Sequence, residues 1–345
     1  MKIAVALSGG VDSACSALML KMAGHDVIAL HMKLIPGHNG TWQKAQSVAD
    51  FIGAPIYLVD LIEPFREFII DYFVSEYASG RTPSPCPRCN RKIKMTLLLE
   101  RALELGASRL ATGHYARTFR KSAGGFGLLK GMDHTKDQSY FLFMLNQAIL
   151  SKICFPLGEL TKNEVRNIAK IHNLPVSLTE ESQELCFTPH TMYTDFLVEH
   201  GLEPKEGPIV DINGHVVGKH KGIMFYTVGQ RRGLGVCGPE PSYVIRIDPS
   251  ENRIVIGKRN STLVSGIVIN QLNFISGNYP EDISEFSIKV RSTSKEVRCV
   301  VDKIQADSLN VYFESPQSGV APGQAAVLYY GDELIGGGWI QQGLK

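Results

Sequence analysis

The sequence has no apolar run long enough to cross a membrane, and it has almost no excess of either charge. With 36 basic and 34 acidic residues, its formal net charge is +2, so binding to a polyanion would need a local basic patch. Residues 1–7 enter a strand pattern directly, without the charged region and cleavage site of a signal peptide. We therefore expect a cytoplasmic protein of ordinary globular composition.

The chain also lacks the cysteine pattern of a disulfide scaffold. Its seven cysteines are an odd number in 345 residues, which favours reduced thiols, some of them reactive or metal-bound. One CxxC is present, Cys86 to Cys89, and no second CxxC or HxxxH completes a four-ligand zinc site. Four cysteines in apolar surroundings are expected to be structural: Cys15, Cys154, Cys237 and Cys299.

The first part of the chain alternates short apolar runs with helix-forming stretches. This alternation predicts βαβ units and a doubly wound parallel sheet of the α/β class. The expected elements are residues 2–7, 14–23, 26–32, 43–52, 56–59, 92–105 and 109–112. Because the whole chain exceeds the size of a single hydrophobic core, we place this first domain at residues 1–150 and expect further domains.

The remaining chain changes pattern twice. Residues 151–206 are expected to form a helical connecting region, in which Thr161 to Glu164 is typical of a capped helix start. Short alternating runs, separated by Gly, Pro, Asn and Asp, then predict small β-domains. We expect a central β-domain over residues 207–265 and a C-terminal β-barrel over residues 266–345.

The loop after the first expected strand lacks the Gly-Lys-Ser/Thr of a Walker loop and the GxGxxG of dinucleotide folds. It reads Ser8-Gly9-Gly10-Val11-Asp12-Ser13. Its glycines allow close approach to an anion, the next helix offers free N–H groups, and Asp12 could hold magnesium on the same phosphates. A bare Gly-Gly turn is common. The full string, however, resembles the loop of the N-type ATP pyrophosphatases, which implies an enzyme that adenylates a carbonyl oxygen.

The CxxC lies between prolines, in an expected loop that opens the helix over residues 92–105. A thiolate at Cys89, beside Arg88, Arg91 and a helix N-terminus, should have a lowered pKa. That would make it both a nucleophile and a good leaving group. A structural zinc half-site is the alternative for an isolated CxxC. A further cysteine, Cys186, stands far along the chain.

Segments along essentially the whole chain resemble the tRNA-specific 2-thiouridylase family (MnmA). The resemblance implies an adenine nucleotide α-hydrolase-like first domain and a sulfurtransferase that modifies tRNA. In the first half the segments are residues 7–13, 80–83 (GRTP), 89–90 (CN), 111–115 (ATGHY), 136–142 (KDQSYFL) and 186–187 (CF). In the second half they are residues 218–222 (GKHKG), 226–235 (YTVGQRRGLG) and 321–324 (APGQ).

The family resemblance implies residue roles and a reaction. Cys186 would carry a persulfide received from a sulfur donor, and Cys89 would assist sulfur release by forming a disulfide with it, after ATP has adenylated the 2-oxygen of a wobble uridine. AMP and pyrophosphate would leave. The tRNA contacts would be Lys136, Asp137 and Gln138. Around ATP, with its magnesium at Asp12, would lie Ala6, Leu7, Ser8, Gly9, Gly10, Val11, Asp12, Ser13, Met32 and Gly113.

Two positions depart from the family pattern. Cys86 stands where many members have aspartate, so Cys86, Cys89 and Cys186 could bind a [4Fe-4S] cluster whose open iron holds hydrosulfide, as in other tRNA-thiolating enzymes. Persulfide and cluster remain equal alternatives. The second departure is Arg291-Ser292, where an Arg-Tyr pair contacts tRNA in relatives; it puts that contact in doubt.

Basic and aromatic residues gather in residues 218–235. Cations there could steer phosphates, and aromatic rings could stack on splayed bases. Composition alone favours a solvated hairpin, but the family resemblance favours tRNA contact, in particular by Arg231 and Arg232. Two histidines at the ends of expected strands, His31 and His114, could be catalytic bases. A role as hydrogen-bonded structural residues explains them at least as well.

Two other functions compete with tRNA thiolation. An amide-forming synthetase of the GMP or argininosuccinate type would also release pyrophosphate, but it needs neither a CxxC nor a distant third cysteine. A non-catalytic iron–sulfur or tRNA-binding protein would not consume ATP. The intact loop from Ser8 to Ser13 counts against that second alternative.

Overall fold

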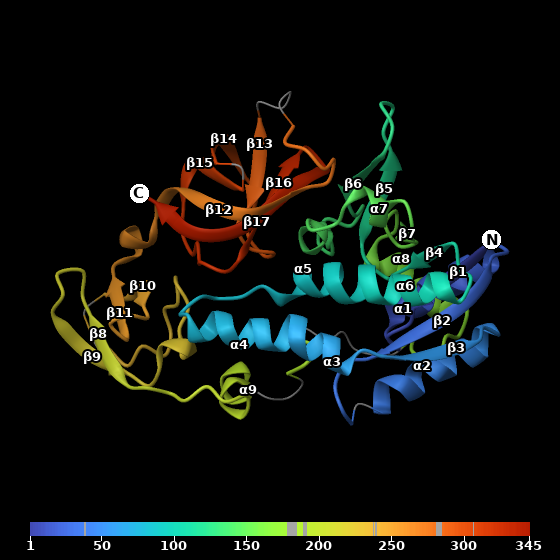
Figure 1. Cartoon of the computed structure of the whole chain (residues 1–345), viewed down its shortest axis with the longest axis horizontal. Helices are drawn as coiled ribbons and strands as arrows, with labels where there is room; N and C mark the ends of the chain where they lie inside the picture. Colours follow the sequence, from blue (N-terminus) through green and yellow to red (C-terminus); the bar gives the residue numbers. More distant parts are fainter. Residues whose placement is uncertain are drawn as a thin grey trace.

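The computed structural model describes residues 1–37, 39–177, 185–188, 192–236, 238, 240–280, 285–305 and 307–345. Figure 1 shows an α/β domain at the N-terminal end, a C-terminal barrel and a small middle sheet, with long helices crossing between them. Among the described residues, no helix combines the length and the hydrophobicity needed to span a bilayer.

The first domain is built on a five-stranded, all-parallel sheet in the order β3-β2-β1-β4-β7. Its strands are β1 (Lys2–Ala6), β2 (Asp26–Lys33), β3 (Ile56–Asp60), β4 (Arg109–Ala111) and β7 (Ile153–Cys154), and its first helices are α1 (Val11–Met22) and α2 (Asn39–Ile52). Central strands of a parallel sheet are covered on both faces, which is why β1 and β2 are runs of buried apolar residues. The predicted α/β class is confirmed.

Two helical rods lie side by side across the middle of the molecule (Figure 1). The first comprises α3 (Ile62–Phe65), the π-helical η1 (Arg66–Ile70) and α4 (Asp71–Ala78); the second comprises α5 (Pro85–Cys89), the π-helical η2 (Asn90–Leu98) and α6 (Leu99–Glu104). Sequence patterns predicted a helix only over residues 92–105. The second rod instead begins at Pro85, a residue well suited to a helix start, so the CxxC is helical and not a loop.

The chain then leaves and re-enters the first domain. The hairpin β5 (Ala116–Arg120) and β6 (Phe126–Lys130) is followed by the 3₁₀ turn η3 (Ser139–Leu142), α7 (Gln147–Leu150), β7 and α8 (Lys162–Ile171). The expected cap of α8 is present, because Thr161 and Glu164 form a capping box. Val165 packs in one core with Ala14 of α1. Residues 151–171, which we expected in a connecting region, therefore pack with the first domain.

The second half forms two β-structures. After α9 (Tyr193–Glu199), a four-stranded sheet has the order β10-β11-β8-β9. Six antiparallel strands then close into a barrel, as predicted, and β6 adds the β5–β6 hairpin to its strand β17. The bounds are β8 (Gly207–Val210), β9 (Val216–His220), η4 (Ile223–Phe225), β10 (Tyr243–Asp248), β11 (Arg253–Gly257), η5 (Arg259–Thr262), β12 (Val264–Phe274), β13 (Phe286–Lys289), β14 (Val297–Gln305), β15 (Ser308–Gln317), β16 (Ala325–Tyr330) and β17 (Glu333–Leu344).

The turn between the two rods joins all three parts of the molecule. The Thr82 amide donates to the Pro322 carbonyl at 2.8 Å, and the Thr82 hydroxyl donates to Thr227 Oγ1 at 3.1 Å. Gln324 Nε2 donates to the Thr82 carbonyl at 2.9 Å. Gly80 has φ +67°, and a Cβ there would lie 2.8 Å from an Ile247 methyl carbon. Three of the segments that resemble the family, residues 80–83, 226–235 and 321–324, thus meet at a domain junction.

Candidate active site

The loop between β1 and α1 is held by its own serines. Ser13 Oγ accepts from the Ser8 amide at 3.2 Å and donates to the Gly10 carbonyl at 3.0 Å. Gly9 has φ +85°, and a Cβ there would lie 2.8 Å from the Thr41 carbonyl oxygen of α2. Only glycine fits this position, because α2 packs directly on the loop. The loop therefore has a fixed shape at the carboxyl end of the central strand, where α/β sheets bind ligands.

Gly113 places the end of β4 against the same loop. A Cβ at Gly113 would lie 2.9 Å from both the Asp12 carbonyl carbon and the Ser13 amide nitrogen. Since β2 and β4 flank β1 on opposite sides, this contact marks the switch point of the sheet. The structure thus brings Gly113 against Asp12 and Ser13, two of the residues that the family resemblance groups with it around ATP.

Asp12 is engaged by two side chains that sequence reasoning missed. Lys162 Nζ lies 2.7 Å and 2.8 Å from the two carboxylate oxygens, and the Tyr115 hydroxyl donates to Oδ1 at 2.8 Å. Lys162 is only 6% exposed. It is the first residue of α8, within the helix start that the sequence did predict, but its distance along the chain from Asp12 hid the contact.

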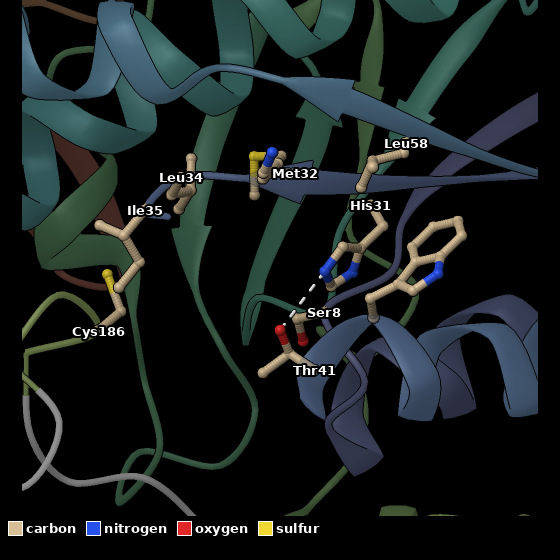
Figure 2. A pocket seen from close by; sticks show the side chains of 10 residues that line it. Ser8, His31, Met32, Leu34, Ile35, Thr41, Leu58 and Cys186 are labelled. Carbon is tan, nitrogen blue, oxygen red and sulfur yellow. Dashed lines mark hydrogen bonds between the residues drawn. The ribbon is translucent and has the colours of Figure 1, made fainter. Parts of the chain in front are cut away.

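A cavity of about 280 Å³ extends from Ser8, in the loop between β1 and α1, to Cys186. We call this loop, Ser8 to Ser13, the phosphate loop. Figure 2 shows Ser8 and Thr41 near one end and Cys186 at the other, with Met32 of β2 and Leu34, just after β2, between them. The remaining lining residues are His31, Lys33, Ile35, Trp42 and Leu58. Of the residues expected around ATP, Ser8 and Met32 line this cavity, while Gly113 lies behind the loop against α1.

Both histidines near the loop are hydrogen-bonded; His31 is buried and His114 is half-buried. His31 Nδ1 donates to the Leu7 carbonyl at 2.8 Å, and burial lowers the pKa of His31 despite that bond. His114 Nδ1 lies 2.6 Å from Thr112 Oγ1. Burial, with a smaller contribution from the charge of Lys94, lowers the pKa of His114 well below its usual value. Both imidazoles are therefore neutral near pH 7.

The three candidate cysteines differ in exposure. Cys89 is buried at 7% exposure, whereas Cys86 and Cys186 reach solvent. The protein nevertheless surrounds all three enough for desolvation to dominate. Burial raises the pKa of Cys89 to about 12, and it also raises the pKa of Cys86 and of Cys186.

The expected low pKa of Cys89 is therefore wrong. The Arg88 guanidinium stacks 4.0 Å from the centre of the Tyr72 ring, and Arg91 donates to Thr96 Oγ1 at 2.8 Å. Because the helix begins at Pro85, Cys89 ends its first segment and does not face a helix N-terminus. Neither arginine is among the groups that shift the pKa of this thiol.

Lys94 supplies the positive charge that the sequence assigned to the arginines. Its charge lowers the pKa of Cys86, Cys89 and Cys186, in each case against the larger effect of burial. Lys94 follows the CxxC within the π-helical η2, and the altered winding there obscures which side chains share a face. Among the described residues, no three His, Cys, Asp or Glu side chains are close enough together to hold a metal ion.

Cys186 is positioned by its neighbour Phe187. The Phe187 ring packs against Phe65, Phe73 and Phe196, with ring centres 5.2 to 5.8 Å apart. Phe187 is buried while Cys186 is exposed. An aromatic anchor between the first rod and α9 thus presents the thiol at the cavity.

The expected tRNA contacts fall into two groups. Asp137 accepts from the amides of Gly131 and Ser139 at 3.1 and 3.0 Å, and Gln138 Oε1 accepts from the Tyr115 amide at 3.2 Å. These two side chains hold their own turn, while Lys136 on that turn is half-buried.

Arg231 and Arg232 are exposed in the middle β-region. Arg291, which precedes the departing Ser292, donates from Nη2 to the Val228 carbonyl at 3.0 Å. It therefore braces the barrel against the segment that carries Arg231 and Arg232.

Three of the cysteines expected to be structural are described, and each has a raised pKa, mainly through burial. The pKa is about 11 for Cys15 and Cys154 and about 12 for Cys299. The Cys15 thiol also donates to the Val165 carbonyl at 3.3 Å. Cys237 lies outside the described residues.

Comparisons with known proteins cover the whole chain. Three family sequence models match in succession: a tRNA methyl transferase HUP domain over residues 1–190, a tRNA methyl transferase PRC-barrel domain over residues 194–258 and an aminomethyltransferase beta-barrel domain over residues 264–340. A solved U34-tRNA thiolase, NcsA from Methanococcus maripaludis with its [4Fe-4S] cluster, is 18% identical and covers 58% of this chain and 65% of its own. Its TM-score of 0.37 is too low to support any conclusion.

Full-length relatives are far more similar. The tRNA-specific 2-thiouridylase MnmA of Geobacter metallireducens is 43% identical, over 98% of this chain and 96% of its own. That of Carboxydothermus hydrogenoformans is 41% identical, over 99% of this chain and 98% of its own. These matches show that the chain belongs to the tRNA-specific 2-thiouridylase (MnmA) family.

Proposed function

We propose that this chain uses ATP to adenylate the 2-oxygen of the wobble uridine of tRNA and then replaces that oxygen with sulfur. The observation that carries the proposal is the shared cavity, because Ser8 of the phosphate loop and Cys186 both line it. A phosphate-binding loop and a solvent-accessible thiol in one cavity are the two components that such a reaction needs.

The first step takes place at the phosphate loop. The uridine 2-oxygen attacks the α-phosphorus of ATP, the bond to the β-phosphate breaks, and pyrophosphate leaves. The loop amides and the N-terminus of α1 (Val11–Met22) would hold the phosphates, because they offer free N–H groups and the positive end of the helix dipole. One carboxylate, Asp12, fits a Mg²⁺ site completed by substrate phosphates, and the ion would neutralise charge on the leaving pyrophosphate.

The second step takes place at the thiols. The terminal sulfur of a Cys186 persulfide attacks C2 of the uridine, the C2–oxygen bond breaks, and AMP leaves with the oxygen. The Cys89 thiolate then attacks Cys186 Sγ, breaking the S–S bond to the transferred sulfur and forming a Cys89–Cys186 disulfide. An external thiol reduces that disulfide. Lys94 supports this step because its charge favours the thiolate forms of both cysteines.

A [4Fe-4S] cluster is the alternative sulfur source. Its candidate ligands are Cys86, Cys89 and Cys186, and three free thiols, one of them lining the cavity, are a suitable donor set. The three thiols do not converge as they would around a single ion, but a cubane cluster is larger and holds its cysteines farther apart. When bound, it would supply an iron at which inorganic sulfide is held.

The tRNA would contact the turn at Lys136 to Gln138 and the exposed pair Arg231 and Arg232. Asp137 and Gln138 shape that turn through hydrogen bonds within the protein, and Lys136 adds a cation for a phosphate contact. Arg231 and Arg232 supply two further cations. We propose a tRNA and a sulfur donor as partners and a cytoplasmic location.

The packing between elements also supports a division of the chain into domains. We propose that the first domain includes β7 and α8, that a short connection carries Cys186, and that the middle β-region and the barrel begin near residues 207 and 266. The hydrogen bonds of Thr82 tie the turn of the helical hairpin to both β-parts.

The test is anaerobic purification with iron and sulfide analysis, followed by thiolation of an unmodified tRNA transcript with ATP. We expect pyrophosphate release that depends on tRNA, together with 2-thiouridine. About four irons and activity that disappears on chelation would establish the cluster route. Activity of iron-free protein with a persulfide donor would establish the disulfide route. Pyrophosphate release with a small amine and without tRNA would contradict the proposal.

A further inference from the structure

The carboxylate expected to bind metal is already occupied in this structure. Both oxygens of Asp12 lie within 2.8 Å of Lys162 Nζ, and Oδ1 also accepts from the Tyr115 hydroxyl. The Asp12 side chain is 32% exposed, but that of Lys162 is only 7% exposed. The ammonium therefore reaches Asp12 from the protein interior, while the carboxylate itself is partly exposed to solvent.

A dication and this ammonium cannot share Asp12 without cost. Like charges at such short range repel, and desolvation strengthens the repulsion beside a buried lysine. Any metal that binds Asp12 must therefore displace Lys162 Nζ or bind together with an anion whose negative charge offsets the repulsion. The phosphates of ATP carry that charge, and they would give the displaced ammonium a new anionic partner.

We propose, on the basis of the function proposed above, that Lys162 keeps Asp12 closed to divalent metal in the ATP-free enzyme and moves onto the pyrophosphate portion of ATP when metal and nucleotide arrive together. In the free enzyme Lys162 blocks metal binding at Asp12. In the complex it becomes a second cation on the leaving group, so metal and nucleotide bind in a coupled manner.

The backbone around Lys162 is braced, so that only its side chain needs to move. The Lys162 amide donates to Asp133 Oδ2 at 2.9 Å, and the α8 capping box holds the residue before it. Tyr115, the other partner of Asp12, is fixed through its amide by Gln138. A lysine on a fixed helix start has a four-carbon stem that can swing between two nearby anions.

The test is titration of Mn²⁺ into the full-length, ATP-free protein. In Lys162→Met the competing cation is gone, so Mn²⁺ should bind roughly tenfold tighter than to the wild type, the size expected for one charge-assisted contact. Single-turnover pyrophosphate release should change in the opposite direction and become slower. Lys162→Arg, which keeps the charge, and Lys170→Met, at the exposed end of the same helix, should bind Mn²⁺ like the wild type.

Unchanged or weaker Mn²⁺ binding in Lys162→Met would overturn the inference. If that variant does not fold, Lys162→Gln removes the charge, keeps a donor toward Asp12 and should show the same tightening. Asp12→Asn separates this inference from the proposed function. If Asp12→Asn abolishes Mn²⁺·ATP binding while Lys162→Met changes nothing, only the inference that Lys162 blocks the metal is wrong. If Asp12→Asn leaves Mn²⁺·ATP binding intact, the assignment of the loop is wrong.

Discussion

The phosphate loop and Cys186 line one cavity, yet the loop and the cysteine site are built in different ways. In the loop, Gly9 and the serines form a shape that depends on backbone geometry, and Asp12 is held by Lys162 and Tyr115. At the cysteine site, Cys89 is buried, Cys86 and Cys186 are exposed, and the pKa of each thiol is raised. The backbone of the loop has a fixed shape in this structure, whereas the thiols must still be deprotonated or bound to a partner.

This difference separates the two halves of the reaction. In the proposed reaction, a preformed loop supports adenylation through fixed backbone geometry. Sulfur transfer instead requires thiolates in a site whose desolvation disfavours them. Substitutions and pH should therefore divide the two half-reactions cleanly.

The largest effect is expected for Asp12→Asn. Loss of the carboxylate removes the expected metal ligand and leaves the buried Lys162 ammonium without its contact to Asp12, so both pyrophosphate release and thiolation should fall by more than about 100-fold. Quench-flow assays of pyrophosphate measure this. Asp26→Asn, exposed at the opposite end of the sheet, is the matched control. Pyrophosphate release at the wild-type rate in Asp12→Asn would show that this loop is not the ATP site.

Cys86→Ala distinguishes the two sulfur sources. The cluster route predicts loss of thiolation with pyrophosphate release retained, because one of three iron ligands is removed. The persulfide route predicts near-normal thiolation, since Cys89 and Cys186 remain. Iron content and 2-thiouridine are measured together, with Cys154→Ala as the control. Near-normal thiolation would rule the cluster out.

The pH profile should separate the half-reactions in iron-free protein. Because burial raises the pKa of Cys86, Cys89 and Cys186, thiolates become available only as pH increases. Sulfur transfer should therefore rise from about pH 7 to about pH 9, and pyrophosphate release should not follow it. A sulfur-transfer rate that is flat or falls over this range would contradict the desolvated site.

Lys94→Met should weaken the thiolate forms further. Its charge lowers the pKa of all three thiols, so without it alkylation of Cys186 by iodoacetamide at about pH 8 should be several-fold slower. Lys92→Met, on the same helix but with its ammonium 5.5 Å from the Phe68 ring centre, is the control. Equal labelling of the two variants would show that Lys94 does not affect the Cys186 thiol.

The smallest effect is expected for Thr161→Ala. This change removes the side chain of the α8 capping box, which should lower the free energy of unfolding by about 1 kcal/mol. Because the cap precedes Lys162, pyrophosphate release should slow slightly while alkylation of Cys186 stays the same. Denaturant unfolding measures the first effect. Unchanged stability would show that the cap does not hold the start of α8.

The sequence predicted the elements whose signals are local. The strand–loop–helix at residues 2–23, the capped start of α8 and the alternating strands of the barrel all follow from short-range patterns, and the structure contains them. The first rod, residues 62–78, was missed. Its π-helical turn disrupts the regular helical spacing of apolar residues on which such predictions depend.

Side-chain environments were harder to predict than backbone. The pKa of Cys89 was expected to be low because Arg88 and Arg91 are its neighbours in sequence, but both guanidinium groups bind elsewhere and the thiol is buried. The Lys162–Asp12 contact joins residues 150 positions apart. Neither feature leaves a local signal, because both depend on how distant elements pack.

The most direct test of the two-step account is a single turnover of Cys186→Ser with ATP labelled at the α-phosphate and an unmodified tRNA transcript. The account predicts that pyrophosphate is released and that labelled, adenylated tRNA accumulates, with no 2-thiouridine. Formation of 2-thiouridine at the wild-type rate in this variant would contradict it, because sulfur would then reach the activated uridine without Cys186.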